Sequence, residues 1–272
     1  MYVEIPREPI KIWYEVTGIQ NADPITTIGG DLMGHRQFFF ANPLLEKEVK
    51  LISWDFRGVG NSDRPIQSYS IDTKVNDLIA VLDSAEIERT HLWATATGSY
   101  TAIRFAARYP ERVGAVITYP QYKPERAMWA IWNSLDKIFD EFEWPEAAKL
   151  VCKLFGGPAS HEEWLGKEFE NGSTAELYRL IHPIQLSSDL TEELRMTTCP
   201  MMVMLGDVGP MGSKSGYARG YESMKQLRPN LDLAVIEGAT GTYCMISHPE
   251  EATSKALEFF QRHPLHSTTH AA

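Results

Sequence analysis

The segment His91-Leu-Trp-Ala-Thr-Ala-Thr-Gly-Ser-Tyr100 decides the fold of this 272-residue chain. It begins as a short apolar strand, passes through small residues, and continues into a helix-like segment that ends before Pro110. When a strand turns this sharply into a helix, the tip residue has a strained backbone and the residues two positions away must be small. Ala96 is at the tip, between Ala94 and Gly98. The spacing predicts a tight strand–turn–helix unit whose tip carries no reactive atom.

Apolar strands and amphipathic helices alternate on both sides of this unit. The predicted strands are 11–17 (an edge strand), 24–30, 49–56, 113–119, 201–205 and 231–236. The predicted helical segments are 38–45, 71–84, 215–227 and 249–262. This alternation favours an α/β fold with a mostly parallel central sheet, covered by helices on both faces. A ligand would then bind at the carboxyl edge of the strands.

The alternation stops between residues 121 and 198, where the sequence has helical periodicity and many aromatic residues. Pro145, the Gly156-Gly-Pro158 segment and Pro183 are expected to divide it into several short helices. We therefore predict a core domain made of residues 1–120 and 199–263, an inserted helical cap of residues 121–198, and a frayed tail of residues 264–272.

Composition limits the classes of partner. The formal net charge is −10, and without a basic cluster this argues against binding to nucleic acid or to anionic membranes. Cys152, Cys199 and Cys244 are far apart and lack metal-ligand spacing, which is typical of reduced thiols. No apolar run could span a bilayer, and the start lacks a signal sequence. We expect a cytoplasmic protein that binds a small molecule and needs no metal or cofactor, with a homodimer as one oligomeric state that the sequence leaves open.

Further segments agree with a known family in type, spacing and order. They are Trp54-Asp-Phe-Arg-Gly-Val-Gly-Asn-Ser-Asp63, Tyr109-Pro-Glu-Arg-Val113, the strand from Cys199-Pro200 to Gly206, and His248-Pro-Glu-Glu251. With the strand–turn–helix unit, they resemble the α/β-hydrolase superfamily, especially the branch with a helical cap that contains haloalkane dehalogenases, epoxide hydrolases and C–C bond hydrolases. The resemblance covers most of the chain and is weakest in the cap. It implies an α/β-hydrolase fold in which the turn at Ala96 is the nucleophile elbow.

The positions that match this family's Ser–His–Asp triad hold other residues. The nucleophile position is Ala96, and the acid position counted from Gly206 is Gly209, with Asp207 directly after the glycine. The histidine position falls in Gly241-Thr242. In a Ser–His–Asp site an imidazole takes the hydroxyl proton and a carboxylate holds the imidazole. Three replacements favour a natural protein without the triad over a hydrolase with one engineered substitution.

The backbone of the elbow could still stabilise negative charge. The N–H of Thr97 and an N–H of the Gly30-Asp31 turn would form a two-donor cradle for an oxyanion or an enolate. The resemblance implies that lyases, isomerases and cofactor-free oxygenases of the superfamily use the same pocket. Asp31 itself has two interpretations: a general base whose pKa is raised in an apolar pocket, or a solvated turn aspartate.

Two more side chains are candidates for proton transfer. Tyr119 ends a predicted strand at the carboxyl edge, and His182 lies near the end of the cap. His35 has the same ambiguity as His182, because a single histidine is often structural. Residues that could instead bind a ligand, each with packing as the alternative, are Gly30, Thr95, Ala96, Thr97, Tyr122, Trp129, Trp132 and Thr242.

Three functions remain open at this point. The first is a non-hydrolytic enzyme of the lyase, isomerase or cyclase type that acts without a cofactor on a small, largely apolar carbonyl- or hydroxyl-bearing molecule. In it, Asp31, Tyr119 or His182 would move a proton. The second is a non-catalytic binding or sensing protein that keeps the pocket. The third is a hydrolase with an inactivated nucleophile.

Overall fold

The computed structural model describes residues 1–124, 126–213 and 218–265. Eight strands of this part form one sheet in the order β1-β2-β4-β3-β5-β6-β7-β8. β1 and β2 pair antiparallel, as do β2 and β4, whereas all other neighbours are parallel. The strands are β1 (Tyr2–Glu4), β2 (Lys11–Gly18), β3 (Pro24–Ile28), β4 (Lys50–Trp54), β5 (Thr90–Ala94), β6 (Val113–Thr118), β7 (Met201–Val208) and β8 (Asp232–Thr240).

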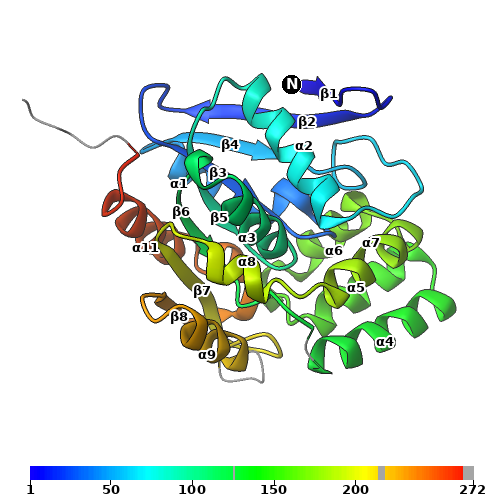
Figure 1. The fold of residues 1–272 in the computed structure, drawn as a ribbon. Coiled ribbons are helices and arrows are strands. Elements are labelled where there is room, and N and C mark those ends of the chain that lie inside the picture. The colour runs from blue at the N-terminus through cyan, green and yellow to red at the C-terminus, as the bar shows by residue number, and fades with distance from the viewer. Residues whose placement is uncertain (125, 214–217, 266–272) are drawn as a thin grey trace, which may run out of the picture.

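Helices cover both faces of this sheet (Figure 1). α2, α3, α8 and α9 follow one another as neighbours on one face, and α1 and α11 pack together on the other. The helices of the core are α1 (Asn42–Leu45), α2 (Ile71–Ser84), α3 (Gly98–Arg108), α8 (Thr191–Met196), α9 (Ala218–Leu227), α10 (Cys244–Ser247) and α11 (Pro249–Gln261), with 3-10 turns η1 (Gly34–Phe38), η2 (Pro110–Arg112) and η4 (Gly241–Tyr243). The predicted α/β fold with a mostly parallel sheet is confirmed.

The remaining helices form a cap at the carboxyl edge of the sheet (Figure 1). They are α4 (Arg126–Glu141), α5 (Trp144–Leu154), η3 (Ala159–His161), α6 (Glu162–Gly172) and α7 (Ala175–Ser187). Their apolar faces pack together and onto the core, because the chain between 121 and 190 contributes buried residues to the same hydrophobic cluster as the sheet. The cap is therefore continuous with the core.

Several predicted boundaries differ from the structure. β2 is not an edge strand, because β1 pairs with its outer side. Pro183 lies inside α7 instead of breaking it. Helix α8, which was expected to belong to the cap, packs on the core face, where Glu193 forms an ion pair with Arg104 of α3 at 2.8 Å. Within the predicted tail, the N–H of Leu265 donates to Asp23 at 2.9 Å, whereas 266–272, like 215–217 of the predicted fourth helix, lie outside the described residues.

The elbow has the geometry that its small residues predict. β5 is fully buried, and the chain turns at Ala96 with φ of +47°, a left-handed conformation that costs a residue with a Cβ roughly 1 kcal/mol. Gly98 is required by sterics, since a Cβ there would lie 2.5 Å from the carbonyl oxygen of Ile28. The turn is closed by backbone bonds from the N–H of Gly98 to Thr95 and from Thr95 to Ile28. These contacts fix Ala96 at the carboxyl edge of the central strands.

Candidate active site

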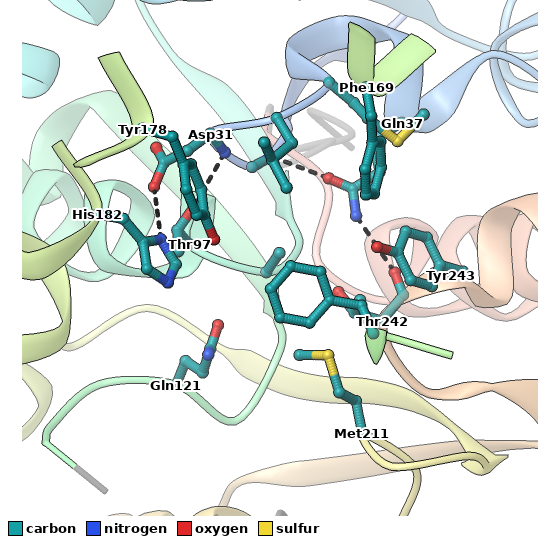
Figure 2. A pocket seen from close by; sticks show the side chains of 15 residues that line it. Asp31, Gln37, Thr97, Gln121, Phe169, Tyr178, His182, Met211, Thr242 and Tyr243 are labelled. Atoms are coloured by element: carbon teal, nitrogen blue, oxygen red, sulfur yellow. Dashed lines mark hydrogen bonds and ion pairs between the residues drawn. The ribbon is translucent and has the colours of Figure 1, made fainter. Parts of the chain in front are cut away.

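A partly open cavity lies between the elbow and the cap (Figure 2). It contains about 420 Å³ of space that no protein atom fills, part of it open to solvent. Its lining is formed by Gly30, Asp31, Leu32, Met33, Gln37, Ala96, Thr97, Gln121, Phe155, Phe169, Tyr178, His182, Met211, Thr242 and Tyr243. These fifteen residues include no serine, cysteine, lysine or arginine.

Two residues that are distant in the sequence meet at one wall of this cavity. Asp31 follows β3, and His182 comes from α7 of the cap; the distance from His182 Nδ1 to Asp31 Oδ2 is 3.2 Å (Figure 2). Both are buried, at 3% exposure each. The second ring nitrogen of His182 points away from Asp31, toward the side of the cavity where Gln121 lies. The geometry is that of a carboxylate that orients an imidazole.

Asp31 is held by two further side chains behind the cavity. Lys74 Nζ of α2 lies 2.5 Å from Asp31 Oδ1, and Gln185 Nε2 donates to both carboxylate oxygens at 2.8 Å. Burial alone would raise the pKa of Asp31, but the Lys74 ammonium and the His182 contact outweigh it and place this pKa well below its usual range. The prediction that an apolar pocket raises this pKa is therefore wrong, because the sequence pattern did not reveal the cation beneath the carboxylate.

Burial favours the neutral form of the His182 ring. Burial lowers its pKa from the ordinary value of 6.5, and Lys74 adds to this effect, while the contact with Asp31 opposes it. Because an ionised carboxylate can only accept, the ring must donate from Nδ1, which leaves Nε2 as an acceptor. The ring is fixed by a stack on Tyr178, with centroids 4.4 Å apart, and by Trp132 at 5.1 Å.

The predicted backbone cradle is partly occupied by the protein's own side chains. The N–H of Gly30 donates to Gln37 Oε1 at 2.9 Å, and the N–H of Asp31 donates to Thr97 Oγ1 at 3.1 Å. Neither N–H is therefore directly available to a ligand, unless Gln37 or Thr97 changes its rotamer. The N–H of Thr97, at the start of α3, remains the donor of the elbow, next to the positive end of the helix dipole.

Thr242 lies opposite the elbow, where the resemblance would place a histidine. Its Oγ1 is 2.8 Å from Thr95 Oγ1, and Thr95 also donates to the Thr242 carbonyl at 3.1 Å. Thr242 lines the cavity, whereas Thr95 lies behind it. On the neighbouring strand, Asp207 Oδ1 accepts from the N–H of Gly238 at 2.7 Å, which ties β7 to β8.

Several other predicted site residues lie outside the cavity lining. The hydroxyl of Tyr119 donates to the carbonyl of Met211 at 2.6 Å, so this tyrosine supports the wall. Tyr122 donates to Ser223 Oγ at 2.9 Å, and Trp132 packs behind His182. Trp129 is a partly buried residue that packs against the core cluster. Aromatic residues at these positions fill space between helices, which periodicity alone does not distinguish from pocket lining.

His35 has a structural role. Its Nδ1 lies 2.7 Å from Asp55 Oδ2, and that carboxylate also accepts the backbone N–H groups of His35 and Asn61. Arg57 forms a buried ion pair with Asp77 at 2.6 Å. These contacts give Asp55 and Arg57 structural roles.

Some residues of the site were not predicted from the sequence. They are Gln37, Lys74, Gln121, Phe155, Phe169, Tyr178, Gln185, Met211 and Tyr243. Two of them did leave a signal. Lys74 lies on the apolar stripe of its helix, between Ile71 and Leu78, and Tyr178 precedes His182 by one helical turn. A cation on an apolar stripe indicates a buried partner.

The described residues contain no cluster of three or more His, Cys, Asp or Glu side chains that could hold a metal ion. In the same residues, no helix is both long enough and apolar enough to cross a membrane.

The fold and the comparisons together define the class of protein. The family described as α/β hydrolase fold matches residues 25–154, and the enol-lactonase from Burkholderia xenovorans superposes with a TM-score of 0.78, at 17% identity, over 96% of this chain and 100% of its own. The protein has the α/β-hydrolase fold.

Particular relatives in sequence are an uncharacterized hydrolase of Saccharomyces cerevisiae and a 2-hydroxymuconate semialdehyde hydrolase of a Pseudomonas species. The yeast protein is 22% identical over 93% of this chain and 94% of its own length. The Pseudomonas enzyme is 34% identical, but over only 45% of this chain and 49% of its own length. At these identities and coverages, the comparisons establish the fold, and the activity has to be argued from the site.

Proposed function

We propose that this protein is a cofactor-independent enzyme that catalyses a non-hydrolytic proton-transfer step, of the lyase, isomerase or cyclase type, on a small uncharged molecule bearing a carbonyl or hydroxyl group. In this proposal His182 is the general base, Asp31 orients it, and the N–H of Thr97 binds the developing oxyanion. Ala96 forms the floor on which the ligand lies, and no covalent intermediate forms there because an alanine cannot attack.

The observation that carries this proposal is the pairing of His182 with Asp31 across the cap–core boundary. A histidine held by a carboxylate at Nδ1, with Nε2 facing a cavity, is the arrangement of a general base. Here the histidine comes from α7 of the cap, whereas the family's histidine position falls after β8, at Gly241-Thr242. The base is thus present although Thr242 occupies that other position.

The cavity favours an uncharged ligand. Its lining contains no lysine or arginine, and the one formal charge on it, Asp31, is already neutralised by Lys74. A carboxylate-bearing ligand would bury an unpaired anion, which is costly. Phe155, Phe169 and Met211 offer apolar contact instead, and aromatic rings favour flat molecules.

The chemical step balances without an additional reactant. His182 Nε2 takes a proton from a carbon beside the substrate carbonyl, and the electron pair of that C–H bond moves into the carbonyl to form an enolate. The Thr97 N–H stabilises the enolate oxygen. The imidazolium returns the proton to a different substrate atom, which gives an isomer and restores neutral His182.

Deuterium exchange tests the base directly. With 2-tetralone, a flat uncharged ketone, as probe, NMR in D₂O measures loss of the α-proton signal. We expect the protein to accelerate this exchange over buffer, and His182→Gln to lower the rate on the order of 100-fold, which is the usual contribution of a general base. His161→Gln is the matched control, because His161 belongs to the cap but lies outside the cavity lining.

Two results would contradict the proposal. One is exchange by the His182→Gln variant at the rate of the unaltered protein, and the other is no acceleration over buffer by the unaltered protein. If 2-tetralone then bound and was recovered without deuterium, the non-catalytic binding function would be favoured instead.

Hydrolysis is the second candidate, since the relatives are named hydrolases and the elbow at Ala96 has the backbone of a nucleophile position. Ala96→Ser tests it with p-nitrophenyl acetate. We expect no gain in ester cleavage, because the neighbouring Thr242 cannot take a hydroxyl proton as an imidazole would. A gain of 10-fold or more, roughly 1.4 kcal/mol of barrier, would support the hydrolase instead.

A further inference from the structure

A lysine ammonium is buried directly beneath the proposed acid–base pair. Lys74 is 1% exposed, and its Nζ lies 2.5 Å from Asp31 Oδ1 and 3.8 Å from the centroid of the Phe56 ring. Lysine is rarely buried to this extent unless it is paired, because taking an ammonium out of water is costly. It does not line the cavity, so its effect on a ligand must pass through Asp31.

We propose that Lys74 is a positioning residue: its ammonium neutralises Asp31, so that the carboxylate orients His182 without drawing a proton onto it. This inference rests on the proposed function, in which His182 is the base. An unpaired buried carboxylate would stabilise the imidazolium, since opposite charges within about 4 Å favour the charged form. A protonated His182 cannot accept a proton from a substrate.

The surrounding charges are consistent with this division of roles. Lys74 faces Asp31 directly and Asp77 at longer range, and Asp77 is already paired with Arg57. His182 contacts Asp31 and interacts with the charge of Lys74 at longer range. The uncharged rings of Tyr178 and Trp132 pack against the His182 ring. Asp31, Lys74 and neutral His182 together carry no net charge, which suits a buried site.

An NMR titration of the histidine ring tests the inference without relying on turnover. The signal of His182 is identified by its loss in His182→Gln, and its protonation is then followed with pH. In Lys74→Met, we expect His182 to take up a proton at a pH higher by about one unit or more than in the unaltered protein. Lys74→Arg should retain the original behaviour, because it keeps the cation.

The control is Lys225→Met. Lys225 lies on α9, outside the cavity lining, and donates to the carbonyl of Leu231. This variant should leave the titration of His182 unchanged. The inference is overturned if His182 in Lys74→Met titrates at the same pH as in the unaltered protein, or at a lower pH.

A second comparison applies if Lys74→Met does not fold. Asp31→Asn leaves the Lys74 cation without its carboxylate, whereas the double variant Asp31→Asn/Lys74→Met removes both charges. His182 should take up its proton at a lower pH in the single variant than in the double variant. Equal titration would refute the inference. If the titration of His182 shifts as expected in these variants but the unaltered protein does not accelerate deuterium exchange of 2-tetralone, Lys74 keeps its role and the proposed reaction is refuted.

Discussion

At the scale of single residues, two buried histidines differ in their hydrogen-bond partners. His182 has Asp31 at 3.2 Å, whereas both ring nitrogens of His91 lack a hydrogen-bond partner among the described residues. His91 is 1% exposed on β5 and stacks on Phe260 at 4.7 Å. Burial lowers the pKa of His91 to about 4. His91 is therefore an apolar packing residue, and charging it would destabilise the fold.

The lowered pKa of His91 makes the free energy of unfolding dependent on pH. The pKa of His91 is lower in the folded protein than in the unfolded chain, where it is about 6.5. The unfolded chain therefore binds the proton first, so stability falls as pH drops below about 6.5, and the loss levels off below about 4. Between pH 7.5 and pH 5, His91 should cost roughly 2 kcal/mol.

Urea unfolding at the two pH values measures this cost. In His91→Leu the difference between pH 7.5 and pH 5 should be smaller by about that amount, whereas His161→Leu should behave as the unaltered protein. An unchanged pH dependence in His91→Leu would show that some other group causes the loss.

At the scale of elements, α7 connects the cap to the candidate site. Tyr178, His182 and Gln185 are spaced by four and three residues, so they share one face of the helix, and that face meets Asp31. The helix continues through Pro183 although a proline lacks the N–H of a helical bond. Packing of its buried residues on both sides of Pro183 holds the helix together, which local propensity does not predict.

Removing one contact of this face should weaken the docking of α7. Gln185→Met takes away both hydrogen bonds to the buried Asp31 carboxylate, and bonds to a charged group contribute roughly 1.5–3 kcal/mol. We expect a loss of about 2 kcal/mol in the free energy of unfolding. Ser187→Ala, on the same helix, removes only a hydroxyl that donates to Ile184 within the helix. Equal stability of the two variants in urea would contradict this account.

At the scale of the whole molecule, the cap is joined to the core along a close seam. Arg36 of η1 forms two hydrogen bonds with Glu168 of α6, at 2.8 and 2.7 Å. The N–H of Gly60 donates to the carbonyl of Gly172 at 2.8 Å. At Gly172 the backbone of α6 lies so close to the loop after β3 that a Cβ would be 1.9 Å from the Leu32 oxygen. Leu32 lines the cavity, so this seam also shapes the site.

Two glycines of α6 give a matched test. Gly172→Ala should displace the cap from the Leu32 loop, lower stability by roughly 1–3 kcal/mol and weaken 2-tetralone binding, because the added Cβ meets backbone. Gly166→Ala should be neutral or stabilising by up to about 1 kcal/mol, since its Cβ would meet only the flexible Lys149 side chain at 3.1 Å. Thermal unfolding and calorimetric titration measure both effects, and equal behaviour of the two variants would refute this interpretation of the seam.

Much of the core could be predicted from local sequence. The helix 71–84 is observed with the same bounds, and the elbow at Ala96 has the expected turn. These succeed because hydrophobic period and small-residue spacing are local properties of the chain. The site was harder: Asp31 and His182 were candidates, but their pairing joins residues 151 positions apart.

Local sequence was sufficient to predict the α/β-hydrolase fold and the tight turn at Ala96, because both depend on residue types at short spacing. The tertiary structure alone decided which candidates share the cavity. It placed His182 beside Asp31, Tyr119 and Trp132 behind the cavity wall, and Lys74 beneath the carboxylate. The physical reason is that charge states and pocket walls depend on which distant segments pack together, and the pKa values of Asp31 and His182 follow from that packing.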